Sequence, residues 1–363
     1  MTHTSVHQPH DTARTSGVLL HPTSLPGRFG IGDLGDELLT FLDWAETAGL
    51  RVWQVLPLNA PGYGNSPYGC LSSYAGNPLL ISPQRLLDEG LLPAGGLDDV
   101  APFPEGHIDF GRVKTLKKEL LHRSYEHFGE HASDEQRRAL AAFVTDNSWL
   151  REWALYAALK GRYDGRPWTA WPRGLADRAQ DAIADARLDL ADEIRFHEYI
   201  QWLFFGQWAA VRKAANARGI RIMGDVPIYV AGDSADVWMN REIFQLDEHG
   251  QPTVVAGVPP DYFSETGSDG AIRSTAGICC ARPTIAGGCH GFAPPSALPT
   301  SFASITSAAL RRTGKSLPPS RRQSADDGCR APAASFSTPY AMHLGTCPSS
   351  PRISGSLLRK CRS

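Results

Sequence analysis

The chain has 363 residues, of which 42% are hydrophobic and 20% are charged, and its formal net charge is −2. This composition excludes a disordered, collagen-like or coiled-coil chain and predicts a soluble globular protein of one large domain or two. No apolar run reaches the roughly 20 residues of a membrane-spanning helix, and the polar start lacks a secretion signal, so we expect a cytoplasmic protein without a membrane partner.

A strand, a helix and a second strand open the ordered part of the chain. The apolar run 17–20 predicts a strand that ends at the turn-rich sequence HPTSLPG, residues 21–27. Apolar residues at helical spacing over 34–45 predict an amphipathic helix, which Gly49 closes. The run 52–58 predicts the second strand. This βαβ unit predicts an α/β protein with neighbouring parallel strands.

A loop and a helical insertion follow. Residues 59–80 are rich in Gly, Pro, Asn, Ser and Tyr, which predicts a functional loop at the C-terminal end of a strand. From about residue 83 to 190 the pattern is mostly helical, which predicts an inserted helical subdomain. Its helically spaced aromatic residues, among them Trp149, Trp153 and Tyr156, are expected in the core of that subdomain.

A long helix over 192–218 then leads into the apolar strand 220–228, which carries one acid, Asp225, near its C-terminal end. In a (β/α) barrel this end of a strand carries the chemistry. Asp225 has two interpretations: a turn or helix-capping aspartate, or a carboxylate that binds a polar substrate at the barrel mouth. Composition does not decide between them.

The loop sequence GYGNSPY, residues 62–68, has Tyr74 and Asn77 beyond it and combines flat aromatic faces with short hydrogen-bonding side chains. Sugars bind to this mixture, because their C–H faces pack on rings and their hydroxyls need donors and acceptors. The alternative is a Gly/Pro turn whose tyrosines fill the core. The residues alone leave both interpretations open.

Separated motifs resemble the 4-α-glucanotransferases of glycoside hydrolase family 77, also called amylomaltases or disproportionating enzymes. The motifs stand in the order of that family and together span nearly all of residues 16–267. They are HPTSLPG (21–27), GYGNSPY with SYAGNP (62–68 and 73–78), GDVPIYVAGDSADVW (224–238) and GVPPDYFSETG (257–267).

This resemblance implies a (β/α)8 barrel with inserted helical subdomains, incomplete here, that works without a cofactor in maltodextrin metabolism. The implied activity is transfer of 1,4-α-glucan segments between maltodextrins or starch-type glucans, by a retaining mechanism that uses two carboxylates. Ser66 and Tyr68 match positions that line the glucan groove, and Asp225 matches a conserved strand carboxylate, so all three are implied substrate-binding residues. The family's nucleophile and acid/base belong to motifs that follow residue 267.

Residues 268–363 form a different kind of sequence. They carry a charge balance of +9, against −11 for the first 267 residues, and contain neither Trp nor Glu. They show no sustained helical or strand periodicity, which predicts a disordered tail. Residues 1–15 form a second, polar tail at the other end, with surface histidines.

Reading the codons of this C-terminal tail in a shifted frame permits strings that resemble the missing family motifs. When the last base of each codon is joined to the first two of the next, residues 268–277 permit QRWGNPLYRW, although the family pattern has Leu as its second letter. Residues 299–316 permit DIVRIDHFRGFEAYWEI, and 346–361 permit LPIIAEDLGVITPEV. These two resemble the nucleophile and acid/base motifs. We therefore predict a single-base loss near codon 267 and an inactive chain with no catalytic residue in frame.

Three other interpretations remain beside the enzyme. Cys279, Cys280, Cys289 and His290 suggest a zinc site, but their spacing fits no standard ligand pattern, so we predict no metal. The basic balance suggests a nucleic-acid arm, but no aromatic residues interleave with the arginines, so we predict no nucleic-acid partner. The third is a non-catalytic maltodextrin-binding or misfolded fragment. The oligomeric state stays open.

Overall fold

The computed structural model describes residues 14–104, 106–225, 230–253 and 255–258, together with four short strands beyond residue 267. These strands are β5 (Ser268–Asp269), β6 (Ser301–Phe302), β7 (Thr313–Ser316) and β8 (Gly328–Cys329). The remainder of 268–363, for which the sequence predicts disorder, lies outside the described residues, as do the first 13 residues and most of the motif at 257–267.

The described residues contain a parallel sheet with the strand order β1-β2-β3-β6. It contains β1 (Gly17–Leu19), β2 (Val52–Gln54) and β3 (Arg221–Gly224), with Gly17 opposite Val52 and Trp53 opposite Ile222. The predicted βαβ unit with parallel strands is therefore confirmed. The eight-stranded barrel stays a prediction.

The second predicted strand is shorter than the apolar run 52–58. The structure ends β2 at Gln54, although the Val55 amide still donates to the Met223 carbonyl at 2.9 Å. Pro57 has no amide hydrogen to continue the ladder, so the chain leaves the sheet here and enters the loop.

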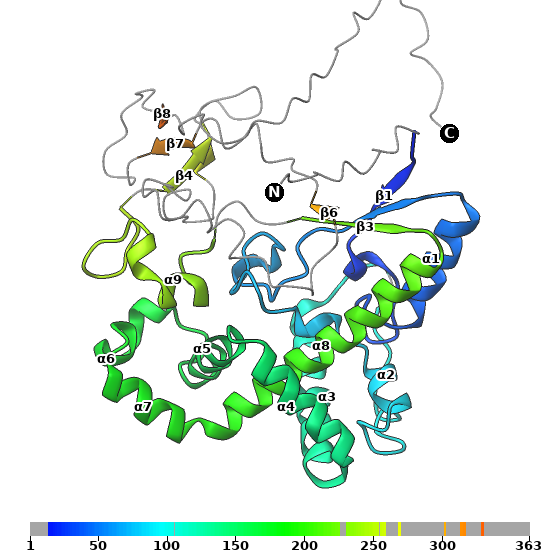
Figure 1. Ribbon diagram of the computed structural model, residues 1–363, viewed down its shortest axis with the longest axis horizontal. Coiled ribbons are helices and arrows are strands. Elements are labelled where there is room, and N and C mark those ends of the chain that lie inside the picture. Colours follow the sequence, from blue (N-terminus) through cyan, green and yellow to red (C-terminus); the bar gives the residue numbers. More distant parts are fainter. Residues whose placement is uncertain are drawn as a thin grey trace, which may run out of the picture.

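Two helices pack against this sheet (Figure 1). Helix α1 (Asp36–Thr47) connects β1 to β2, and the long helix α8 (Ala191–Ala217) leads into β3, as the sequence predicts. Trp208 of α8 meets Trp53 of β2 edge to face, with ring centroids 6.1 Å apart. Both rings are fully buried, and they join the helix to the sheet in one hydrophobic core.

The helical insertion lies between β2 and α8 and supplies two cores. Helices α2 and α3 contribute Leu86 and Leu120 to the core of the sheet, whereas α5 builds a second core with α9, in which Tyr156 and Trp238 are fully buried. The insertion contains α2 (Pro83–Asp88), α3 (Phe110–His131), α4 (Asp134–Asp146), α5 (Leu150–Arg162), α6 (Arg173–Ala176) and α7 (Gln180–Asp189). Trp153 and Tyr156 are core residues, as predicted, and Trp149 is half-buried between the two cores.

Short elements complete the described part of the chain. Helix α9 (Ala235–Met239) follows β3, and β4 (Val255–Val258) lies in an antiparallel sheet of order β5-β4-β7-β8. Single 3-10 turns occur at η1 (Pro22–Ser24), η2 (Tyr63–Asn65), η3 (Pro78–Leu80), η4 (Trp168–Ala170) and η5 (Arg241–Ile243).

A buried ion pair connects the insertion to the first βα connection. The Lys117 ammonium on α3 lies 2.8 Å from the Asp33 carboxylate and donates to the Ile81 carbonyl at 2.6 Å. Burial lowers the pKa of Lys117, and the negative charge of Asp33 opposes that shift. Loss of either partner would leave the other charge buried and unpaired, so this pair fixes α3 against the connection between β1 and α1.

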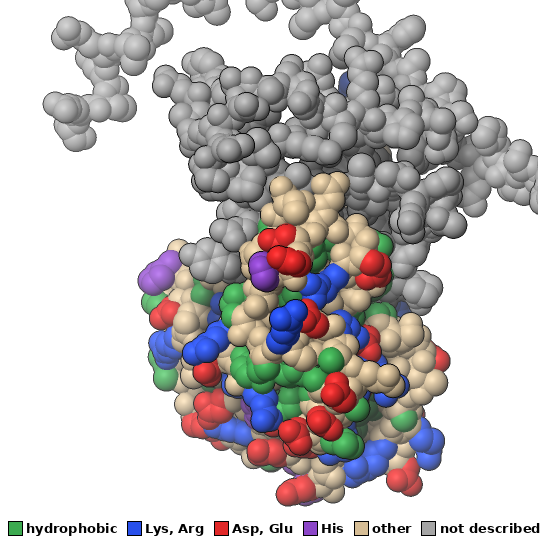
Figure 2. Space-filling model, turned by 90° about the vertical axis from the view of Figure 1, so that its left-hand side faces the viewer, with side chains coloured by type: hydrophobic (Ala, Val, Ile, Leu, Met, Phe, Trp, Pro, Cys, Tyr) green, Lys and Arg blue, Asp and Glu red, His purple; other side chains and the backbone are tan. Residues whose placement is uncertain are grey.

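The side of the molecule nearest α6 and α9 carries acidic and basic side chains next to one another (Figure 2). Asp177, at the end of α6, lies 3.2 Å from Arg173 and 2.9 Å from Arg241.

No helix among the described residues is long and apolar enough to cross a bilayer.

Candidate functional site

The loop over residues 59–80 follows β2 and pairs with itself. An antiparallel bridge joins Pro61 to Cys70, and the Gly62 amide donates to the Gly69 carbonyl at 2.8 Å. These bonds satisfy the backbone of the loop internally, so it forms a defined structure without a sheet. We call residues 62–69 the tip of the loop and residues 72–77 its base.

The tip turns through two consecutive residues with left-handed backbone. Gly64 has φ 76° and Asn65 has φ 56°, a conformation that Gly and Asn adopt most readily. The Ser66 hydroxyl then accepts the Tyr68 amide at 3.3 Å, a local turn that fixes the direction of the tyrosine. Tyr68 is 36% exposed, so part of its ring faces solvent.

Asp225 meets this tip from the far end of the sequence. It directly follows β3, at the C-terminal end of the parallel sheet, and is half-buried. The Tyr68 hydroxyl donates to Asp225 Oδ2 at 2.7 Å. The structure therefore brings together the three residues that the sequence selected, since Ser66 orients Tyr68 and Tyr68 contacts Asp225.

The helix that follows Asp225 has another residue as its cap. The helix that follows it, α9, is capped by the Ser234 hydroxyl, which accepts the Val237 amide at 3.3 Å. Asp225 lies before this cap and accepts the Tyr68 hydroxyl, and its interpretation as a turn aspartate stays open.

Tyr68 is protonated at neutral pH. Burial, followed by the hydrogen bond and the negative charge of Asp225, raises the pKa of Tyr68 to about 12. Tyr68 therefore donates through its hydroxyl hydrogen, and the carboxylate accepts. Together they offer an aromatic face, a hydroxyl and a carboxylate, which can bind a polyol, whereas cleavage of a glycosidic bond by a retaining route needs a second carboxylate.

The base of the loop has a different role from the tip. The ring of Tyr74 stacks on Trp149, with centroids 5.8 Å apart and planes 19° apart. Asn77 is buried, and its side chain accepts the Leu79 amide at 3.0 Å as the cap of η3. Tyr74 therefore packs against the helical insertion, and Asn77 caps a turn.

Two polar side chains for which the sequence predicted no role hold the base. Gln201 on α8 accepts the Gly76 amide at 2.7 Å and donates to the Gly76 carbonyl at 3.1 Å. Asp236 on α9 accepts the Ser73 amide at 2.8 Å and the Ser73 hydroxyl at 3.2 Å, both on Oδ2. Gln201 had a sequence signal, a polar residue on the apolar face of a helix. Asp236 had none, because an acid in the first turn also suits the helix dipole.

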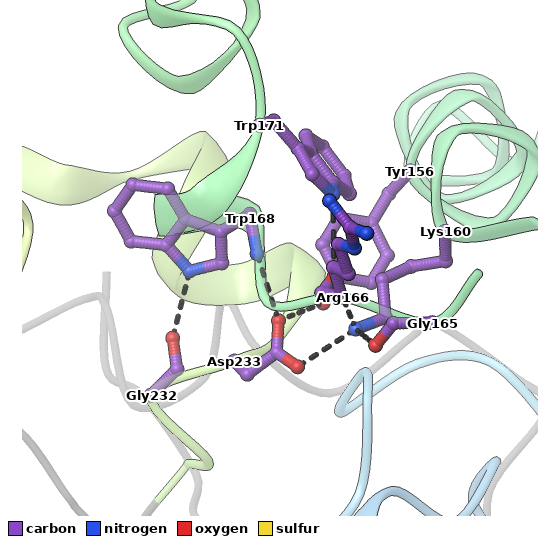
Figure 3. A network of polar contacts seen from close by, with 8 residues as sticks. All are labelled: Tyr156, Lys160, Gly165, Arg166, Trp168, Trp171, Gly232 and Asp233. Carbon is purple, nitrogen blue, oxygen red and sulfur yellow. Dashed lines mark hydrogen bonds and ion pairs between the residues drawn. The ribbon is translucent and has the colours of Figure 1, made fainter. Parts of the chain in front are cut away.

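Asp233 joins the segment after β3 to the helical insertion (Figure 3). Its carboxylate lies 2.7 Å from the Lys160 ammonium and accepts the Tyr156 hydroxyl at 3.0 Å and the Trp168 amide at 3.2 Å. The Trp168 indole donates to the Gly232 carbonyl at 2.8 Å. This network fixes Gly232 and Asp233, and with them the start of α9, against the insertion.

No group of three or more His, Cys, Asp or Glu side chains is placed to hold a metal within the part of the chain that the structure describes. The four candidate zinc ligands at 279–290 lie outside that part. Cys70 is fully buried, and burial together with the charge of Asp236 raises its pKa to about 12, so its thiol is neutral at physiological pH.

Comparison with known proteins finds one family. The 4-alpha-glucanotransferases, glycoside hydrolase family 77, match over residues 20–269. The 4-alpha-glucanotransferase of Thermus thermophilus is 51% identical over 255 residues, which cover 70% of this chain and 50% of that protein. That of Synechocystis is 46% identical over 256 residues, which cover 70% of this chain and 51% of that protein. The chain thus spans about half the length of these relatives.

Solved structures agree. The amylomaltase from Streptococcus agalactiae, solved in complex with acarbose, superposes with a TM-score of 0.69 at 33% identity. The match covers 73% of this chain and 53% of that one. The described residues therefore have an amylomaltase-like fold, with the loop of 59–80 and the end of β3 inside the matched family region.

Proposed function

The chain belongs to the 4-alpha-glucanotransferase family, glycoside hydrolase family 77, and from this premise we propose that its described residues form the glucan-binding half of such an enzyme. The complete protein would transfer 1,4-α-glucan segments between maltodextrins or starch-type glucans in the cytoplasm. Its β1, β2 and β3 would be strands of a (β/α)8 barrel whose mouth carries the site.

The contact between Tyr68 and Asp225 supports this proposal most directly. It joins two family motifs that are 157 residues apart, at the C-terminal end of the parallel sheet. In a glucan complex, the exposed part of the Tyr68 ring would pack on the C–H face of a glucose unit. The Asp225 carboxylate and the Ser66 hydroxyl would bind sugar hydroxyls, because both are hydrogen-bond acceptors within reach of the tip.

The chemistry itself belongs to carboxylates that this chain lacks in frame. A retaining transfer needs a nucleophile and an acid/base carboxylate about 5–5.5 Å apart. The family match ends at residue 269, next to the position where the shifted frame begins to permit family motifs. This agreement supports a single-base loss near codon 267. The chain as it stands would therefore not transfer glucan segments.

A disproportionation assay tests the proposal. Purified chain incubated with maltotriose should yield neither glucose nor longer maltodextrins, whereas the product of a gene with one base restored at codon 267 should yield both. Glucose and longer products from the unrestored chain would show that the chain is catalytically active. A restored protein without transferase activity would contradict the assigned reaction.

The second candidate is a non-catalytic maltodextrin-binding fragment, which the intact Tyr68–Asp225 contact favours. Calorimetric titration of the full chain with maltoheptaose should then show saturable binding. A barrel without its later strands has open edges, so the competing outcome is a misfolded fragment. A cooperative thermal transition followed by circular dichroism would distinguish a folded binder from that fragment.

A further inference from the structure

Asp236 is a buried carboxylate that is not part of the Tyr68–Asp225 contact. It is only 1% exposed, and both hydrogen bonds that it accepts from Ser73 end on the same oxygen, Oδ2. The other oxygen, Oδ1, is also buried and has no hydrogen-bond partner among the described residues. A half-satisfied buried carboxylate is costly, so its retention here needs an explanation.

The groups that face Asp236 are neutral at physiological pH. Cys70 and Tyr74 come from the loop and Tyr156 from α5, and the negative charge of Asp236 contributes to the raised pKa of all three. Burial raises the pKa of Asp236 itself to about 6, opposed by the hydrogen bonds from Ser73 and from its own backbone. Its protonation therefore changes within an accessible pH range.

Two bonds connect α9 to the loop just beyond the tip. The Ala235 amide donates to the Leu71 carbonyl at 2.8 Å, and the next residue, Asp236, holds Ser73. Leu71 in turn donates its amide to the Ala60 carbonyl at 2.9 Å, on the opposite side of the loop. The first turn of α9 therefore fixes Leu71 and Ser73, which directly follow the tip. Tyr68 belongs to that tip.

We propose that Asp236 is a positioning residue for the loop, and that its protonation loosens the tip and weakens glucan binding. This inference rests on the proposed function of the same site. The ionised carboxylate accepts two charge-assisted bonds, which are roughly twice as strong as neutral ones. Protonation weakens both bonds and adds a buried O–H, so glucan affinity should fall about fivefold between pH 7 and pH 5.

Stability should move in the opposite direction. The folded-state pKa of Asp236 is raised above the unfolded value, so the folded chain binds the proton more tightly. This group therefore stabilises the fold as the pH falls through about 6, while the loop loosens. A residue with a purely structural role would change binding and stability in the same direction.

Calorimetric titration of the full chain with maltoheptaose at pH 5 and pH 7 tests the inference, with Asp236→Asn as a mimic of the protonated form. The dissociation constant of the variant should exceed that of the wild type about fivefold at pH 7 and equal it at pH 5. Asp185→Asn, at an exposed carboxylate on α7, should match the wild type at both pH values. An Asp236→Asn to wild-type ratio that is the same at both pH values would overturn the inference.

Hydrogen exchange makes the test independent of glucan binding. Peptides from residues 60–77 should exchange faster in Asp236→Asn than in the wild type at pH 7 and equally at pH 5. If the wild type binds no maltoheptaose at either pH, the proposed function fails and this exchange comparison alone decides the role of Asp236. If Asp236→Asn does not fold, Ser73→Ala replaces it and should show a smaller difference with the same pH dependence.

Discussion

The tip and the base of one loop have almost the same composition and opposite roles. Tyr68 in the tip is 36% exposed and donates to a carboxylate at the end of β3, whereas Tyr74 in the base stacks on Trp149 of the insertion. The Ser66 hydroxyl accepts the Tyr68 amide within the tip, whereas Ser73 in the base donates its amide to Asp236. The difference teaches that the role of a loop residue depends on the element that lies against it.

Substitution of Gly76 should give the largest change in stability, because a side chain at this position would disrupt the packing of the base. A Cβ added at Gly76 would overlap the ring of Phe204 on α8. We expect Gly76→Ala to lower the free energy of unfolding by about 3 kcal/mol, measured by urea denaturation. Gly206→Ala, on the exposed side of the same helix where a Cβ meets no atom within 4 Å, should instead stabilise the chain by about 0.5 to 1 kcal/mol. Equal effects of the two substitutions would contradict a tightly packed base.

Removal of the Gln201 side chain should give the next largest effect. Gln201→Ala leaves the buried Gly76 amide and carbonyl without their partners, which should cost about 2 kcal/mol in the same denaturation experiment. Gln84→Ala, which removes a surface hydrogen bond to Asp88, should change stability by less than about 0.5 kcal/mol. A small loss for Gln201→Ala would mean that water replaces the glutamine and that the base is not held from α8.

A substitution in the tip should change the affinity for maltoheptaose and not the stability of the chain. Tyr68→Phe removes the donor to Asp225 from a partly exposed site, so we expect an unchanged melting temperature and about tenfold weaker binding of maltoheptaose. Tyr74→Phe keeps the stacked ring on Trp149 and should leave the affinity unchanged. Calorimetry on both variants decides the matter, and a similar loss of affinity in each would remove the distinction between tip and base.

The smallest effect concerns the ionisation of Tyr68. Asp225→Asn removes the negative charge that contributes to the raised pKa of Tyr68, so this pKa should fall from about 12 part of the way towards 10. Because a raised tyrosine pKa in the folded state favours the protonated form, the contribution of this group to stability is lost as the pH rises through 12. Ultraviolet titration of tyrosinate, with Tyr68→Phe to assign the signal, measures the shift. An unchanged titration would mean that burial alone sets the pKa.

The sequence predicted much of the fold because local patterns are strong there. The apolar spacing of α8 and its stop at Gly219, which has φ 68°, placed the longest helix to within a residue or two at either end. The strand 52–58 was predicted too long, because an apolar run continues beyond Gln54 although Pro57 cannot join a ladder. A helix or strand with its own apolar periodicity can be predicted from the sequence. Where it ends depends on the residues that pack or pair with it.

The candidate site likewise contains residues that the sequence predicted and residues that it did not. Ser66, Tyr68 and Asp225 were selected by motif, and the structure brings them together. Asp236 and Gln201 were not selected. An acid in the first turn of a helix looks like a surface residue until its neighbours are known, and the position of Gln201 on the apolar face of α8 was its only signal.

By itself, the sequence determined the βαβ start, the helical insertion, the family motifs and the change in character after residue 267, because each of these is written in the order or the period of the residues. Only the tertiary structure decided that Tyr68 is exposed, that Tyr74 packs on the insertion, and which carboxylate Tyr68 meets. Tyr68 and Asp225 are 157 residues apart, so their 2.7 Å contact exists only once parallel strands bring their C-terminal ends to one edge.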